Sequence, residues 1–388
     1  PTEIVQPAAV YSLTGRLTET SSRLPFAVAN LTALFGVFLL GWRLFNPLTG
    51  WIAAMFFAVD GYFIGFSRIV QYQSVVFLTS ILVVLILYRL VQQPRNFSRY
   101  LTLASILLAA GLLSHYEAAL VVIPAAFLLA VLFWQNRSVW RQILVGTVLG
   151  GAVGVAMLAI FYVPFVLHPH FQATYTYLTD RRIGGSFPYN NLADFLLRTT
   201  VYSTTYYVGM LIAFTVIALI RAYWRGLGRI WGMVLGGFAL VLIATTLWNP
   251  AWMTMGETDL IVLPFALLLG LAVFTPKMSV AERMLWLWFG LTMLLAIFFT
   301  EKPRTHVYTF FLPWLLLAAQ GVAFSWDGLR AKVGRGTALL VGAATALLLT
   351  LLFGSYAYWY FINNTPEILR NWAPSHPSGY WVPYDEPD

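Results

Sequence analysis

Long apolar runs separated by short polar connections make up most of this 388-residue chain. A helix needs about 20 apolar residues to cross hydrocarbon about 30 Å thick, and only a helix or a closed barrel satisfies its backbone hydrogen bonds there. The runs are continuous and lack the alternation of barrel strands. We therefore predict twelve spanning helices, over 24–41, 48–66, 74–92, 100–114, 117–134, 142–166, 206–220, 231–248, 259–275, 284–300, 308–325 and 337–361.

These runs predict an all-α integral membrane protein, a polytopic helical bundle of about twelve transmembrane helices with extracytoplasmic loops. The fourth run is short, and with the fifth it could instead form a helical hairpin that does not fully cross. We divide the chain into an outer segment over 1–23, a transmembrane domain over 24–361 with an outer loop over 167–207, and an outer segment over 362–388. Because the chain starts outside, we expect either a leader that is removed or, as the favoured alternative, a preceding helix that enters from the cytoplasm.

The basic residues fall mainly in every second loop. One set of loops carries fourteen Lys and Arg against two acidic residues, Glu282 and Asp327, whereas the other set, with both termini, carries nine basic and thirteen acidic residues. Under the positive-inside rule the first set is cytoplasmic, so both ends of this chain are predicted to be extracytoplasmic. We expect the plasma (inner) membrane as the location.

Composition excludes several classes of protein. Hydrophobic residues make up 60% and charged residues 10%, far from the roughly 25% charged residues of a soluble domain. The pI of about 9.6 reflects topology, and we predict no nucleic-acid partner. Cysteine is absent, which excludes thiol catalysis and disulfides.

Polar and aromatic residues gather in the predicted outer segments. The loop over 167–207 combines Arg181 and Arg182 with several tyrosines, Tyr189 among them. Aromatic rings beside charges suit a sugar or a lipid headgroup, because rings cover apolar sugar faces while charges meet hydroxyls and phosphates. An interfacial aromatic belt is the alternative interpretation.

A second outer segment, TEKPRTHVYTFFLPW over 300–314, places Lys302, Arg304 and His306 within five residues at a helix entrance. Arg offers a two-pronged donor to phosphate oxygens and Lys a point charge, so these residues could hold a phosphate where lipid meets water. Charged side chains that extend from a span end to the surface are the competing explanation.

The segment SRIVQYQS places Arg68 and Gln71 between two spans on the outer side, with Asp60 about two turns deeper. An ionisable residue at that depth is costly unless it is paired or faces a cavity. The helical phase makes a structural ion pair between Asp60 and Arg68 one explanation of both residues.

Two carboxylate-containing segments complete the outer set. SHYEAAL gives His115 and Glu117 between the fourth and fifth spans, where no loop breaker occurs, so these side chains are expected to dip into the protein. A metal pair is an alternative, but it supplies too few ligands. Glu257 and Asp259 stand two apart, so they do not share a helix face.

The chain resembles bacterial membrane glycosyltransferases of the GT-C fold, in the branch of dolichyl-phosphate-mannose protein mannosyltransferases and aminoarabinose transferases. Four segments carry the resemblance: SRLPFAVANLTALFG, SRIVQYQSVVFL, LLSHYEAALVVIP and KPRTHVYTFFLPWLLLAAQG. Each is degenerate alone, but their order and spacing run through most of the chain. The resemblance implies a hexosyltransferase-type enzyme that moves a sugar from a polyprenyl-phosphate donor to an acceptor on the outer face, as in protein glycosylation.

The resemblance also suggests roles for individual residues. Lys302, Arg304, His306 and Tyr308 would hold the lipid phosphate, Arg68, Gln71, His115 and Glu117 would face the donor cavity, and Arg181, Arg182, Tyr189, Glu257 and Asp259 are candidates for acceptor or sugar contacts. Such enzymes use an acidic base in the first outer loop. In 1–23 only Glu3 and Glu19 are acidic, neither in the expected Asp-Glu context, so we expect the base upstream.

Partners and alternatives follow from this interpretation. We expect the polyprenyl-phosphate sugar donor, membrane lipids and an extracytoplasmic acceptor (protein, lipid or glycan) as partners, with other membrane subunits left open. No cofactor is predicted, and the sequence does not support a divalent metal. A non-catalytic membrane subunit or scaffold that retains the fold is the alternative. A transporter fits less well, because most charges lie at span ends on one side.

Overall fold

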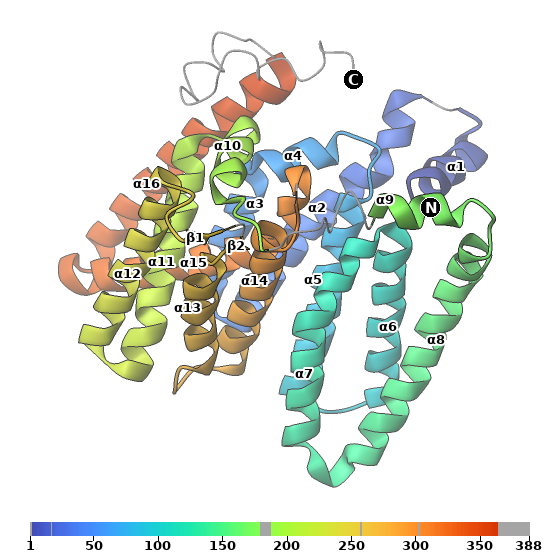
Figure 1. The fold of residues 1–388 in the computed structure, drawn as a ribbon, viewed down its shortest axis with the longest axis horizontal. Helices are drawn as coiled ribbons and strands as arrows, with labels where there is room; N and C mark the ends of the chain where they lie inside the picture. Colours follow the sequence, from blue (N-terminus) through green and yellow to red (C-terminus); the bar gives the residue numbers. More distant parts are fainter. Residues whose placement is uncertain (1, 17, 179–187, 257, 302, 364–388) are drawn as a thin grey trace.

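The computed structural model describes residues 2–16, 18–178, 188–256, 258–301 and 303–363. The first half of the chain forms α1 Thr2–Thr14, α2 Glu19–Leu44, α3 Pro47–Val59, α4 Gly61–Ser67, α5 Gln73–Gln92, α6 Phe97–Ser114, the 3₁₀ helix η1 Tyr116–Val121, α7 Val122–Gln135, the 3₁₀ turn η2 Arg137–Val139 and α8 Trp140–Val166 (Figure 1). Apolar side chains dominate all the long helices.

The second half begins with two short helices and continues with long ones. Its elements are α9 Phe171–Leu178, α10 Leu192–Tyr202, α11 Thr205–Leu227, α12 Arg229–Trp248, β1 Thr254–Met255, β2 Thr258–Asp259, α13 Val262–Phe274, α14 Val280–Phe298, the 3₁₀ helix η4 Arg304–Phe310, α15 Phe311–Val333, α16 Arg335–Tyr358 and the π-helical turn η5 Trp359–Asn363. The two strands pair antiparallel, Thr254 opposite Asp259.

In the described part of the chain, ten helices are long and apolar enough to cross a membrane, and α3 with α4 forms an eleventh, bent candidate. Both α6 and the combined η1–α7 helix pass this test, so the fourth and fifth predicted spans are each long enough to cross. The predicted span over 259–275 contains α13, which has 13 residues and is shorter than a perpendicular crossing needs. The predicted fold class, an all-α multi-pass membrane protein, is confirmed.

The predicted span over 48–66 is not one continuous helix. The helix is interrupted at Asp60, and the chain direction bends by 64° between α3 and α4. The Asp60 carboxylate accepts a hydrogen bond from the Tyr62 backbone at 2.9 Å, and the Ser203 hydroxyl accepts one from Gly61 N–H at 3.0 Å. An acidic N-cap satisfies backbone donors that would otherwise be unpaired inside the bundle, so it starts a new helix in a new direction.

Helix α15 lies at the centre of the second half of the bundle. Nearly every side chain from Phe311 to Ala319 is buried, and α15 packs against α3, α11 and α14. At Gly321 a methyl group would collide with the backbone carbonyl of Phe214 in α11. The absence of a side chain therefore allows α11 and α15 to approach closely, as small residues do in membrane bundles.

Helices α6, α7 and α8 form a separate flank of the molecule (Figure 1). Gly146, Gly150 and Gly154 recur at four-residue intervals on the face of α8 that packs along α6. A Cβ at Gly150 would lie 2.9 Å from the Leu101 backbone, so only glycine permits this contact. The opposite face of α8 is apolar and exposed, as expected for a surface that meets lipid.

The short helices α4, α9 and α10 gather at one end of the bundle, and the connections α5–α6, α7–α8 and α13–α14 lie at the other (Figure 1). The first end, here called the outer end, carries the segments predicted to be extracytoplasmic. The second, the basic end, carries the Arg-rich loops. The alternation of charge in the sequence thus corresponds to two ends of the folded molecule.

Candidate functional site

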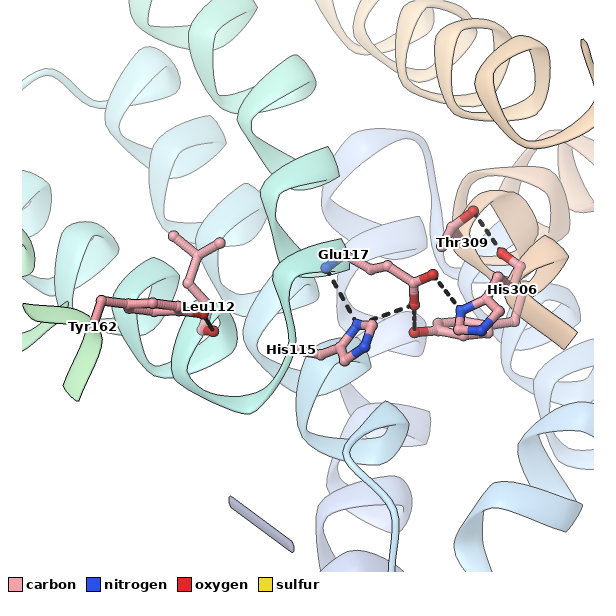
Figure 2. Close-up of polar contacts among 7 residues, drawn as sticks. Leu112, His115, Glu117, Tyr162, His306 and Thr309 are labelled. Atoms are coloured by element: carbon pink, nitrogen blue, oxygen red, sulfur yellow. Dashed lines mark hydrogen bonds and ion pairs between the residues drawn. The ribbon is translucent and has the colours of Figure 1, made fainter. Parts of the chain in front are cut away.

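Four polar side chains from two distant segments meet at the outer end. The Glu117 carboxylate accepts hydrogen bonds from the Tyr308 hydroxyl and from Nδ1 of His306, which lies 189 residues further along the chain. One Glu117 oxygen also lies 3.3 Å from Nδ1 of His115. Figure 2 shows Glu117 between the two imidazole rings. We call His115, Glu117, His306 and Tyr308 the Glu117 cluster.

The 3₁₀ helices η1 and η4 position the two halves of the cluster. His115 follows the last residue of α6 in an extended conformation, and its Nδ1 accepts the backbone N–H of Glu117 at 3.3 Å. This cap starts the 3₁₀ helix η1, so the apolar run turns back into the membrane as α7. On the other side, η4 carries His306 and Tyr308 directly into α15. Two short 3₁₀ helices at the mouths of long spans therefore face each other.

Aromatic packing holds the cluster in place. The Tyr72 ring stacks on His115 with centroids 3.7 Å apart and an interplanar angle of 2°. The Tyr308 ring meets Phe66 and Phe77 edge to face, each at 5.3 Å. Edge-to-face and stacked pairs contribute roughly 0.5–1.5 kcal/mol each beyond their buried area. The polar atoms therefore sit on a rigid apolar base that fixes their directions.

The cluster is largely screened from solvent. The side chain of Glu117 is 9% exposed, and those of His115 and His306 are 17% exposed each. A buried carboxylate is tolerated only when hydrogen bonds satisfy it, and here His306 and Tyr308 each hydrogen-bond to one of its oxygens. Glu117 therefore orients its neighbours, because each hydrogen bond to it fixes a ring or a hydroxyl.

Cavities flank η4 on both sides. Glu117 and Tyr308 line a small cavity of about 20 Å³ together with Ser80, Trp288 and Thr309, enough for about one water molecule. On the other side of η4, a wholly apolar cavity of about 110 Å³ lies between α10 and the helices from α11 to α15. The segment η4 thus separates a polar site from an apolar one.

The structure places only part of the predicted phosphate site. His306 and Tyr308 join the Glu117 cluster, and the backbone of Arg304 belongs to η4, two residues before His306. The side chain of Arg304 and all of Lys302 lie outside the described residues. Arg181, Arg182 and Glu257 lie outside them as well.

The predicted donor-cavity residues separate into two groups. His115 and Glu117 belong to the cluster, and Gln71 adjoins Tyr72, which stacks on His115. Arg68 instead donates to the backbone carbonyl of Phe361. This bond ties the end of α4 to the π-helical turn that follows α16.

The pairing of Asp60 with Arg68, one explanation drawn from the sequence, does not occur among the described residues. Asp60 is fully buried and caps α4, whereas Arg68 ends α4 and turns outward to Phe361. The helical phase that favoured a pair assumed one continuous helix through residue 60, and the 64° bend removes that geometry.

Tyr189 and Asp259 lie elsewhere on the outer end. The backbone N–H of Tyr189 donates to the carbonyl of Phe298 at 2.8 Å, so this segment runs along the end of α14. Asp259 belongs to the two-residue strand β2, and its carboxylate accepts the Ile261 N–H at 3.0 Å.

Two members of the site escaped the sequence analysis. Tyr72 stacks on His115, and Trp288 lines the small cavity beside Glu117. Tyr72 lies between two glutamines in SRIVQYQS, and an aromatic residue among polar ones is only a weak indication of a binding site. Trp288 sits in the apolar run of α14 and carries no signal in the sequence, because only helix packing brings it to Glu117.

Among the described residues, no group of three His, Asp or Glu side chains has an arrangement that could hold a metal ion. Glu117 instead occupies its two oxygens with side-chain donors. Glu117 is the acceptor, and the His306 imidazole and the Tyr308 phenol are its donors. Such hydrogen bonds fix the orientation of an imidazole, so that its other nitrogen can face a bound anion.

Residues 7–168 match the family model described as dolichyl-phosphate-mannose-protein mannosyltransferase. The family resemblance predicted from the sequence is confirmed. The matching segment includes His115 and Glu117 and ends before His306 and Tyr308. No curated protein sequence matches the chain.

Two solved structures are similar to this chain. Crystal structures of ArnT from Cupriavidus metallidurans and of the Archaeoglobus fulgidus oligosaccharyltransferase, both in the apo form, give TM-scores of 0.46 and 0.47 at 14% and 13% identity. The alignments cover 92% and 100% of this chain but 57% and 50% of those proteins. The chain therefore spans about half the length of each of these proteins.

Proposed function

We propose that this protein is a membrane glycosyltransferase that moves a sugar from a polyprenyl-phosphate donor to an acceptor on the extracytoplasmic face. The observation that carries the proposal is the meeting of His115 and Glu117 with His306 and Tyr308 at the outer end. The match of residues 7–168 to a mannosyltransferase family supports the same reaction type.

The chemistry of such a transfer requires a positive site for the departing phosphate. The bond between the sugar and the phosphate oxygen breaks, and negative charge builds on the phosphate, so oriented donors and cations lower the barrier. Arg304 and Lys302 belong to the same short sequence segment as His306, and both would contribute positive charge to such a site. The imidazoles of His115 and His306, oriented by Glu117, would provide directed hydrogen bonds to the phosphate oxygens.

The placement of the site suits a lipid-linked donor. The cluster lies at the mouths of α5, α7 and α15, where spans end, so a phosphate there would sit at headgroup depth. An isoprenoid chain attached to that phosphate would extend into the hydrocarbon beside apolar helices. A soluble nucleotide-sugar would not need this position.

The acceptor hydroxyl requires a base, which Glu117 is poorly placed to supply because its oxygens are occupied by His306 and Tyr308. Glu19 forms an ion pair with Arg23 at 2.6 Å and is exposed. We therefore assign the base to neither residue, and we retain the expectation of an acid in the first outer loop.

Replacement of Arg304, the arginine of the predicted phosphate site, tests the donor assignment. In Arg304→Ala we expect transfer from a polyprenyl-phosphate sugar to fall about tenfold or more, since a charge-assisted hydrogen bond contributes about 1.5–3 kcal/mol. The dissociation constant for polyprenyl phosphate, measured with purified protein, should rise by the same factor. The thermal unfolding midpoint should stay unchanged.

The matched control is Arg16→Ala, an exposed arginine in the outer segment over 1–23. It should leave the affinity for polyprenyl phosphate unchanged. If Arg304→Ala binds polyprenyl phosphate as tightly as the wild type, the donor assignment is wrong. If the wild type binds none, the scaffold alternative replaces the transferase.

A further inference from the structure

A second polar hollow lies at the basic end, far from the Glu117 cluster. It has a volume of about 1020 Å³ and opens between the α5–α6 connection and the α7–α8 connection. Arg95, Arg99 and Arg141 line it, together with the neutral polar side chains of Asn136 and Gln142. No acidic residue lines it. The hollow therefore concentrates positive charge between two hairpins of the α6–α8 flank.

The arginines of this hollow have no acidic partner in the described part of the protein, and the one internal contact given for Arg141 is with the Trp140 ring, whose centroid lies 5.7 Å from the guanidinium. Among the described residues, none of Arg95, Arg99 and Arg141 takes part in an ion pair. On the other half of the basic end, Arg225 pairs with Glu282 at 2.7 Å, and Arg283 donates to backbone carbonyls of the α13–α14 connection. The charges of the hollow thus lack polar partners of the kind that Arg225 and Arg283 have.

The surroundings of the hollow indicate a lipid. Trp134 is exposed beside it, with the Arg137 guanidinium 4.0 Å from its ring centroid, and Trp140 is also exposed. Exposed tryptophans of this kind mark the headgroup level of a membrane. Val145 lines the hollow, and the exposed apolar face of α8 continues from it through Val148. A headgroup in the hollow would therefore have a surface for its acyl chains directly beneath it.

We propose that this hollow binds the phosphate headgroup of an anionic phospholipid, with its acyl chains along α8. Arginine matches phosphate geometry with two parallel donors, and basic pockets between helices on the positive side of a membrane protein bind anionic headgroups. The bound lipid bridges the α5–α6 and α7–α8 connections, which strengthens the attachment of α8, a helix that packs mainly on α6.

The test is lipid retention by the purified full chain. Native mass spectrometry from mixed micelles of dioleoyl-phosphatidylglycerol and dioleoyl-phosphatidylcholine should show one retained phosphatidylglycerol. Each arginine near an anionic lipid contributes about fivefold in affinity. Arg141→Gln alone should therefore bind phosphatidylglycerol about fivefold more weakly, and the triple variant Arg95→Gln, Arg99→Gln, Arg141→Gln on the order of 100-fold more weakly. Phosphatidylglycerol should also raise the thermal unfolding midpoint of the wild type and not that of the triple variant.

The control variant Arg43→Gln, Arg229→Gln, Lys332→Gln removes the same charge from exposed positions of the basic end that do not line the hollow. It should retain phosphatidylglycerol like the wild type. Equal loss in both variants would mean unspecific attraction, and equal retention in both would exclude the site. If inorganic phosphate raises the midpoint as much as phosphatidylglycerol, the hollow takes a soluble anion and the lipid assignment fails.

Discussion

Glu117→Gln should reduce sugar transfer on the order of 100-fold, because it removes the carboxylate that orients the His306 imidazole and the Tyr308 hydroxyl. Glu117 accepts from His306 and Tyr308 in a largely buried position, and two charge-assisted hydrogen bonds together contribute about 3 kcal/mol. Glutamine keeps the shape but turns one acceptor into a donor that faces His306. The affinity for polyprenyl phosphate should fall with the transfer rate.

A double-mutant cycle tests whether Glu117 acts by positioning His306 or only by stabilising the fold. If Glu117 acts through His306, the variants Glu117→Gln and His306→Gln are not additive, and the double variant should bind polyprenyl phosphate about as weakly as either single one. Asp327→Asn, an exposed carboxylate near the basic end, is the matched control and should bind normally. Additive losses, or a Glu117→Gln protein that binds and transfers normally, would show that the cluster is only structural.

Gly321→Ala should destabilise the bundle by about 3 kcal/mol, the upper part of the usual range for overpacking. The added methyl would collide with the Phe214 carbonyl, which belongs to rigid backbone and cannot rotate away. Helices α11 and α15 must then separate. Because α15 continues directly from η4, the shift should also displace His306 and lower transfer. The thermal unfolding midpoint in detergent measures the first effect.

The control for this variant is Gly237→Ala in α12, where nothing lies within 4 Å of the added methyl group. Alanine favours a helix over glycine by about 1 kcal/mol, so this variant should be neutral or slightly stabilised. If Gly321→Ala unfolds at the same temperature as Gly237→Ala, the close approach of α11 and α15 does not limit stability.

The sequence by itself determined where the long apolar helices lie in the chain and at which end of the molecule each connecting loop lies. An apolar run long enough to span hydrocarbon must satisfy its own backbone hydrogen bonds, and a helix does this without help from the rest of the chain. All twelve predicted runs are mainly helical in the structure. The alternation of basic loops likewise placed His115, Glu117, His306 and Tyr308 on one side before any packing was known.

Only the tertiary structure decided which of these residues meet. His306 and Glu117 are 189 residues apart, and their contact depends on how η1 and η4 are carried by α7 and α15. The assignment of His306 to a phosphate site came from local composition, and that of Glu117 to a separate donor cavity came from the family resemblance. Neither source contains information about the distance between spans. The structure joins the two into one cluster.

The break at Asp60 is a second case in which the sequence did not show which residues come into contact. From the sequence we predicted that the buried Asp60 needs a hydrogen-bond or ion-pair partner. In the structure the partner is a backbone N–H of α4, and Arg68 donates to Phe361 instead. Hydropathy records whether a segment prefers lipid, and this preference is local and additive along the chain. Side-chain partners depend on which helices pack together and at what angle, and packing of the whole bundle sets both.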